Sequence, residues 1–277
     1  MTEETRGAGR ARWPWAVLMT LVPAVVAAGC GGSAGDGAAS TEPVGAATDE
    51  GVIEGPVLVF AAASLTDAFG EMEAAFEAAH PAVDVQLNLA GSSSLREQIL
   101  EGAPADVFAS ANEANMDQVG EAGETAGDPE VFAENRLQIA VPAGNPGGVT
   151  GLDDFADPEL LIGLCAEGVP CGDFARESLA EAGVVPDVDT NEPDVRALLT
   201  KVGADELDAG IVYVTDVRAA GDLVEGIDIP EEDNVVATYP IAELAGAPNP
   251  DAAAGFVEFV RSEDGRAILA SYGFVAP

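Results

Sequence analysis

The sequence predicts an α/β protein with a doubly wound parallel sheet, and three segments near the start of its main body carry that prediction. Residues 56–61 form a continuous apolar run, which is typical of a strand buried on both faces. Residues 65–79 place apolar side chains at helical spacing, and Pro81 closes that helix. Residues 83–89 alternate apolar and polar side chains, as a second strand does. This succession of strand, helix and strand favours parallel strands connected by helices.

The same alternation continues and predicts the remaining elements in order. Helices are expected at 94–100, 172–182 and 193–202, with a helical region at 250–270. Strands are expected at 107–109, 137–141, 161–164, 211–213 and 235–238. One small domain does not need this many strands, so we expect two lobes.

Composition excludes several classes of protein. Of 277 residues, 48% are hydrophobic, which is enough for a sizeable core and argues against wholesale disorder. The chain has 49 acidic residues against 11 basic ones, a net charge of −38, and Lys201 is its one lysine. Nucleic-acid binding and polybasic attachment to anionic lipid both depend on Lys and Arg, so neither is expected. The acidic surface favours solubility, and we expect a monomer.

Few residues could support metal or acid–base chemistry. Cys30, Cys165, Cys171 and His80 do not have the spacing of a zinc site. A Ser-His-Asp or Cys-His enzyme would need His80 as its base. His80 precedes Pro81 at a predicted helix end, where we expect a surface cap residue. A secreted hydrolase with Ser64 or Ser92 as nucleophile therefore lacks a base, and the sequence has no G-x-S-x-G motif. We expect no enzyme and no cofactor.

The N-terminus has the pattern of a bacterial secretion signal. Three arginines precede an apolar run at 13–29, as in a signal peptide. The run ends in Ala27-Ala28-Gly29-Cys30, which resembles a lipobox with Ala27 where leucine is usual. We predict a signal peptide over 1–29, lipidation of Cys30 and a flexible tether over 30–55. The lipid on Cys30 would anchor the chain on the outer face of the cytoplasmic membrane. Plain secretion and a retained membrane anchor are the alternatives.

Three turns that lead from a strand into a helix are suited to anions. They contain Ser64, Ser92 and Cys171, and the first turn of each following helix offers unpaired backbone N–H groups and a partial positive charge. The alternative is simple helix capping, because Ser64 with Asp67 and Ser94 with Glu97 fit the S-x-x-D/E pattern. The residues alone also allow Tyr213, at a strand end, to be a core residue.

The ordered motifs of the chain carry a family resemblance. They are Val59-Phe60-Ala61-Ala62-Ala63-Ser64-Leu65-Thr66, Gly91-Ser92-Ser93-Ser94-Leu95, Gly102-Ala103-Pro104-Ala105-Asp106-Val107-Phe108, Val169-Pro170-Cys171-Gly172, Asp194-Val195-Arg196, Gly210-Ile211-Val212-Tyr213 and Tyr272-Gly273-Phe274. Together, from about residue 57 to 274, they resemble the periplasmic molybdate-binding proteins of ABC transporters. Each motif alone is weakly specific, whereas their order over most of the chain is a strong signal.

The resemblance implies a type II periplasmic-binding-protein fold with two α/β lobes joined by crossing strands. Lobe 1 would comprise 56–137 plus 237–277, and lobe 2 would comprise 138–236. The implied ligand is molybdate or tungstate, and the implied partner is an ABC permease. The metal would be bound only as its oxyanion. The implied donors are hydroxyl and backbone N–H groups of Ser64 and Ser92, backbone N–H groups of Cys171 and Val195, and the Tyr213 hydroxyl. Alanine is usual where Cys171 stands.

The donors suit a fully deprotonated dianion, which has only acceptors. Sulfate is the alternative ligand, since only the resemblance favours molybdate over it. A partly protonated phosphate would be better served by a carboxylate acceptor, and Asp67 and Asp106 lie close to the matched turns in sequence.

The two remaining cysteines are predicted to pair. The compartment is oxidising, Cys30 is committed to lipid, and Cys165 and Cys171 lie across the loop from a strand to a helix start. The alternative is two free buried thiols.

Overall fold

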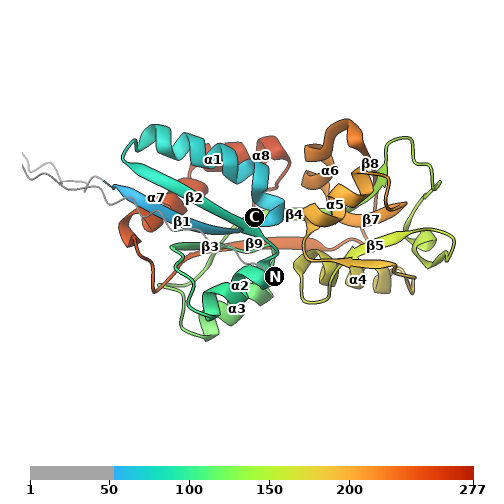
Figure 1. Ribbon diagram of the computed structural model, residues 1–277, viewed down its shortest axis with the longest axis horizontal. Helices are drawn as coiled ribbons and strands as arrows, with labels where there is room; N and C mark the ends of the chain where they lie inside the picture. Colours follow the sequence, from blue (N-terminus) through green and yellow to red (C-terminus); the bar gives the residue numbers. More distant parts are fainter. Residues whose placement is uncertain (1–52) are drawn as a thin grey trace, which may run out of the picture. The chain divides into compact units, whose positions relative to one another are not determined.

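The computed structural model describes residues 53–277, which fold into two α/β lobes joined by crossing strands (Figure 1). The predicted signal peptide, the lipidation site at Cys30 and the tether up to residue 52 lie outside the described residues. No helix within 53–277 is both long and apolar enough to span a bilayer.

Most expected elements are present. Lobe 1 contains β1 (Gly55–Ala62), α1 (Thr66–Ala79), β2 (Val83–Ala90), α2 (Ser92–Leu100), β3 (Val107–Ala109), α3 (Glu113–Glu121), α7 (Pro250–Arg261) and α8 (Glu263–Tyr272). Lobe 2 contains β5 (Ile162–Cys165), α4 (Pro170–Glu181), β6 (Thr190–Glu192), α5 (Val195–Gly203), β7 (Ala209–Tyr213), α6 (Val214–Ala220) and β8 (Val224–Asp228). The crossing strands are β4 (Glu130–Pro142) and β9 (Val236–Glu243).

The sheet is mixed rather than wholly parallel, which corrects the expectation from the sequence. Its strand order is β2-β1-β3-β9-β4-β7-β5-β6, with β8 paired to β4. β1 pairs in parallel with β2 and β3, and β5 with β6 and β7, as successive strand–helix–strand units require. The crossing strands β4 and β9 pair antiparallel with their neighbours because they connect the lobes.

The strand β4 changes partners along its length. It pairs with β9 from Glu130 to Arg136 and with β7 from Leu137 onward. We propose that the lobes divide at this change, which corresponds to the division into 56–137 plus 237–277 and 138–236.

Helices cover both faces of each lobe's sheet (Figure 1). In lobe 1, α1, α7 and α8 pack together on one face, around Phe69, Phe76 and Phe256. On the other face α2 and α3 enclose a second apolar cluster that includes Phe60 and Phe108. In lobe 2, α5 and α6 lie on one side of the sheet and α4 on the other. The carboxyl ends of β1, β2 and β5 lead into the three turns predicted to bind an anion, and β7 ends at Tyr213.

Several boundaries differ from the prediction for local reasons. The helical region 250–270 is two helices, because Ser262 caps α8 by accepting a hydrogen bond from the Gly265 N–H at 3.1 Å. His80 is the C-terminal cap of α1, as expected, but it is half-buried, with its ring 4.6 Å from that of Phe76. The helices α3 and α6 and the strands β6 and β8 were not predicted.

Candidate functional site

The five predicted ligand-binding residues line one small cavity between the lobes. The cavity volume, measured as the space that the centre of a water-sized sphere can occupy, is about 10 Å³. It can therefore hold one small ligand. Ser64 and Ser92 reach it from lobe 1, and Cys171, Val195 and Tyr213 reach it from lobe 2. All five residues are buried. Its remaining lining residues are Ala62, Ala63, Gly91, Ala111, Val169, Pro170 and Asp194.

The two serines of lobe 1 are held by hydrogen bonds rather than acting as caps. The Ser64 hydroxyl lies 2.9 Å from the Tyr239 hydroxyl, and Ser92 Oγ accepts from the Ala111 N–H at 3.0 Å. Because Ser92 Oγ already accepts a bond, its own proton remains available to a guest. The capping alternative is wrong, since neither α1 nor α2 has a side-chain cap. Tyr239 was not found from the sequence, and it orients Ser64 from β9.

Lobe 2 contributes backbone amides from two helix entrances. Cys171 is in the first turn of α4, which begins at Pro170, and Val195 is the first residue of α5. First-turn N–H groups have no intrahelical acceptor, so these amides can donate to an anion. Asp194 caps α5, because its Oδ1 accepts from the Ala197 N–H at 2.9 Å.

Tyr213 presents a hydroxyl without a partner. It ends β7, its side chain is 1% exposed, and its hydroxyl makes no hydrogen bond to any residue within 53–277. Burial, with Tyr239 and Asp216 nearby, raises the pKa of Tyr213 well above its usual range, so the hydroxyl keeps its proton. A buried, unpaired donor beside a cavity indicates a site that a hydrogen-bond acceptor would complete.

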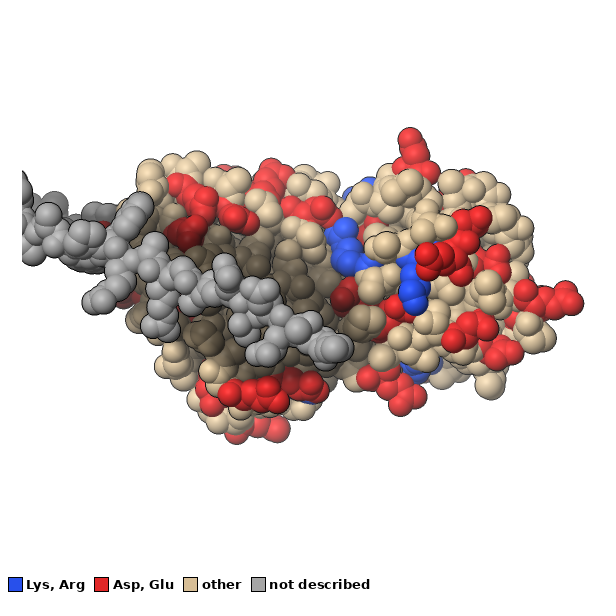
Figure 2. All heavy atoms as spheres, viewed as in Figure 1, with Lys and Arg blue, Asp and Glu red and all other residues tan. Residues whose placement is uncertain are grey.

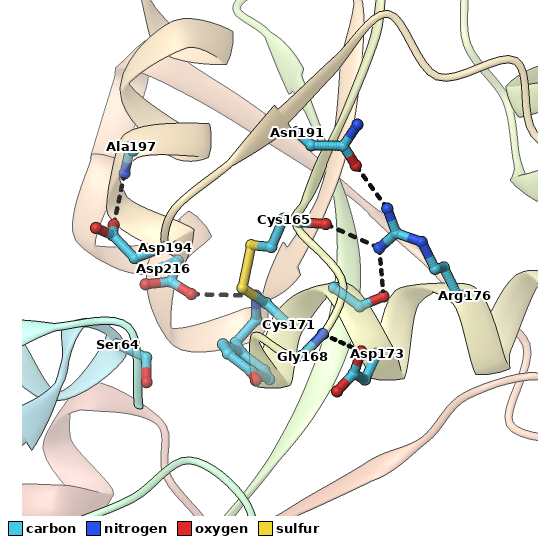
Figure 3. The surroundings of a disulfide bond; sticks show 12 residues. Ser64, Cys165, Gly168, Cys171, Asp173, Arg176, Asn191, Asp194, Ala197 and Asp216 are labelled. Carbon is cyan, nitrogen blue, oxygen red and sulfur yellow. Dashed lines mark hydrogen bonds between the residues drawn. A yellow bond between two sulfur atoms is a disulfide. The ribbon is translucent and has the colours of Figure 1, made fainter. Parts of the chain in front are cut away.

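The turn that presents Cys171 is held from several sides (Figure 3). A disulfide joins Cys165 at the end of β5 to Cys171. Arg176 Nη1 donates to the carbonyl oxygens of Cys165 and Gly172, at 2.8 Å each. A Cβ on Gly172 would lie 2.1 Å from the Ala166 carbonyl oxygen, so the turn needs glycine there. The Cys171 amide is therefore fixed before any ligand arrives.

We expect the disulfide to stabilise the protein measurably. Replacing both cysteines by alanine should lower the free energy of unfolding by about 2 kcal/mol, the loop-closure contribution of so short a loop. Denaturant titrations of both proteins measure this difference. A thiol assay on the denatured, unreduced protein without Cys30 should find no free thiol, and two free thiols per chain would contradict the pairing.

Asp67 and Asp106, the two carboxylates that lie near the matched turns in sequence, do not add acceptors to the cavity. Asp106 is buried elsewhere, where it accepts from the backbone N–H groups of Leu58 and Asn249 at 2.7 and 2.6 Å. Asp67 pairs with Arg196. Neither lines the cavity.

Acidic side chains are spread over both lobes on the face shown in Figure 2, and basic ones are few. The described part of the chain has no cluster of three or more His, Cys, Asp or Glu that could hold a metal ion.

Asp216 is a titratable group beside the site that was not identified from the sequence. It is fully buried in α6, and its Oδ2 accepts from the Tyr213 N–H at 3.1 Å. Its Oδ1 lies 3.2 Å from Arg196 Nε, without the alignment of a hydrogen bond. Burial raises the pKa of Asp216 to about 7, although Arg196 opposes that shift.

This pKa predicts a pH-dependent stability. The unfolded chain releases the Asp216 proton at about 3.9, whereas the native state holds it to about 7. The stability from this group is therefore complete below the lower pKa and is lost as pH rises through the higher one. We expect wild type to lose unfolding free energy relative to Asp216→Asn between about pH 4.5 and about pH 7.5, and not above. Urea titrations at several pH values measure the difference, and a constant difference would contradict the assignment.

Comparisons with known proteins show the family to which the chain belongs. The model of the bacterial extracellular solute-binding protein family matches residues 57–275. The molybdate-binding protein ModA of Mycobacterium bovis is 40% identical over 221 residues, which cover 80% of this chain and 85% of that protein. The chain belongs to the ModA family of bacterial extracellular solute-binding proteins. Members of this solute-binding family are not enzymes, in agreement with the expectation from the sequence.

Two further relatives are informative about this family member. A putative ABC transporter substrate-binding lipoprotein of Bacillus subtilis, YvgL, is 29% identical over 222 residues, covering 79% of this chain and 85% of that protein. The periplasmic molybdate-binding protein of Azotobacter vinelandii has a TM-score of 0.71 at 18% identity and covers 80% of this chain and 99% of that one. The latter likeness shows the periplasmic-binding-protein fold that the sequence resemblance implied.

Proposed function

We propose that this chain is a lipid-anchored receptor that binds molybdate, and also tungstate, outside the cytoplasm and delivers it to an ABC permease. One observation carries the proposal: five buried residues from both lobes converge on one small cavity, and the donors they offer are uncharged. The Mycobacterium bovis relative that is named as a molybdate-binding protein supports the choice of ion.

The chemistry of the cavity favours a fully deprotonated tetrahedral dianion. Such an ion has acceptors on every side, and the proposed site surrounds it with hydroxyl and backbone N–H donors. A hydrogen phosphate would also need an acceptor for its own proton, and the lining has one carboxylate, that of Asp194, whose Oδ1 already accepts from the Ala197 N–H. Discrimination against phosphate would therefore require that the other Asp194 oxygen, Oδ2, accept no hydrogen bond from the ligand.

Calorimetric titration with molybdate, tungstate, sulfate and phosphate tests the proposal. We expect molybdate and tungstate to bind tightly and phosphate not to bind. Bound ligand should also stabilise the protein by about 2.7 kcal/mol at a hundredfold excess over Kd, without turnover. Tight sulfate binding with weak molybdate binding would replace the proposed ligand by the alternative dianion. No binding by any of the four ions would reject the function.

A serine pair tests the site itself. Ser92→Ala removes one hydroxyl donor to a buried dianion but keeps the Ser92 amide, so we expect Kd to rise by about tenfold, the low end for a bond to a charged group. Ser93 is the matched control, because it neighbours Ser92 in α2 and does not line the cavity. Ser93→Ala should leave Kd unchanged. Equal effects of the two substitutions would count against the assignment.

The lipid anchor is tested by fractionation of cells. Wild type should sediment with membranes, and Cys30→Ala should lose that attachment. The relative of Bacillus subtilis that is named as a lipoprotein supports this expectation. Recovery of wild type mainly as free protein would favour plain secretion, and membrane attachment of Cys30→Ala would favour a retained membrane anchor.

A further inference from the structure

An ion pair joins the two lobes beside the cavity. Asp67 lies in the first turn of α1, directly after the turn that carries Ser64, and it pairs with Arg196 of α5. Among the ion pairs of residues 53–277, this pair alone links lobe 1 to lobe 2. Neither side chain lines the cavity, so the pair acts outside the direct ligand contacts.

Arg196 also connects the pair to the donors of lobe 2. It follows Val195 in the chain, and its Nε lies 3.2 Å from Oδ1 of the buried Asp216. The other carboxylate oxygen of Asp216 accepts from the Tyr213 N–H. Arg196 therefore ties the segments of Val195 and Tyr213 to the segment of Ser64. The Arg196 and Asp67 side chains are 26% and 41% exposed, so water screens their attraction only in part.

We propose that Asp67 and Arg196 are positioning residues that hold the cleft closed over the ligand and so slow its release. This inference rests on the proposed function, in which donors from both lobes surround one anion. The pair can form only when the lobes are together, so its free energy adds to closure and not to either lobe alone. Its loss should appear mainly in the dissociation rate.

The negative charge of the chain allows two effects of removing Asp67 to be distinguished, because they change the affinity for a dianion in opposite directions. Removing an acidic side chain from a protein of net charge −38 reduces its repulsion of a dianion and should tighten binding. Loss of a closing contact should weaken it. Glu71 is the matched control: it is also on α1, and its carboxylate accepts from the Tyr272 hydroxyl at 2.9 Å within lobe 1.

Calorimetry and stopped-flow dissociation with molybdate compare Asp67→Ala with Glu71→Ala. We expect Asp67→Ala to raise Kd by about threefold to fivefold, the size of a partly exposed ion pair, through faster dissociation. Asp67→Lys should raise Kd further, because its ammonium group would repel Arg196. Glu71→Ala should leave Kd unchanged or lower it. An Asp67→Ala protein that binds as tightly as Glu71→Ala and releases ligand at the wild-type rate would overturn the proposal.

A measurement without ligand separates this proposal from the function on which it rests. Spin-labelled unnatural residues at the exposed positions Glu121 of lobe 1 and Glu181 of lobe 2 report the distance between the lobes. Ligand-free Asp67→Ala should populate longer distances than Glu71→Ala does. If wild type binds none of the four ions, the function fails and these distances still decide the role of the pair. Identical distributions in both variants would then reject it.

Discussion

Replacement of Gly91 by alanine should abolish tight binding while leaving the fold intact. A Cβ on Gly91 would lie 2.5 Å from the backbone oxygen of Pro193, which belongs to lobe 2. Backbone cannot move aside as a flexible side chain can, so the lobes could not close fully. Lobe 1 itself should tolerate the change, because Gly91 has φ −59° and ψ 137°, a conformation open to any residue.

The expected loss follows from the donors that closure brings to the ligand. A cleft held open would forfeit the Cys171 and Val195 amides and the Tyr213 hydroxyl, and each bond to a charged ligand contributes about 1.5–3 kcal/mol. We therefore expect Kd for molybdate to rise by at least about a thousandfold, measured by calorimetry. Gly70→Ala is the control, since a Cβ there meets no atom within 4 Å, and it should leave Kd unchanged. Wild-type affinity in Gly91→Ala would mean that closure does not depend on this contact.

The site residues that could be predicted from the sequence are those whose local structure depends on neighbouring residues in the chain. Ser92 and Cys171 stand at helix entrances that short sequence patterns can show, and the structure has α2 beginning at Ser92 and α4 at Pro170. The Tyr213 hydroxyl and the Val195 amide became candidates only through the family resemblance. A tyrosine that ends a buried strand has the same local pattern whether or not its hydroxyl is paired.

The unpredicted part depends on how distant segments meet. Arg196 reaches Asp67, 129 residues away, and Tyr239 reaches Ser64, 175 residues away, and no local pattern encodes either contact. The helix α3 was missed because its apolar positions are sparse, and only Met116 and Val119 among its apolar side chains are buried. The antiparallel direction of β4 and β9 was not predicted, because the crossover between lobes is a property of the whole chain, whereas strand–helix–strand spacing is local.

Removal of the Tyr213 hydroxyl should have opposite effects on stability and on binding. In the ligand-free protein this buried hydroxyl has no partner among residues 53–277, and an unsatisfied buried polar group costs about 1–3 kcal/mol. Tyr213→Phe should therefore raise the free energy of unfolding without ligand. With ligand it removes the only donor that this residue offers, so Kd for molybdate should rise by up to about 150-fold.

Tyr239→Phe is the matched comparison, because it removes a buried tyrosine hydroxyl that does have a partner. Tyr239 is equally buried and packs against Tyr213 with ring centroids 6.1 Å apart, but its hydroxyl bonds Ser64. Its removal leaves Ser64 without that partner, so the unfolding free energy should fall rather than rise. Denaturant titrations and calorimetry on both variants compare the two effects. If Tyr213→Phe destabilised the ligand-free protein as much as Tyr239→Phe does, the Tyr213 hydroxyl would be satisfied within the fold and would not be held ready for an anion.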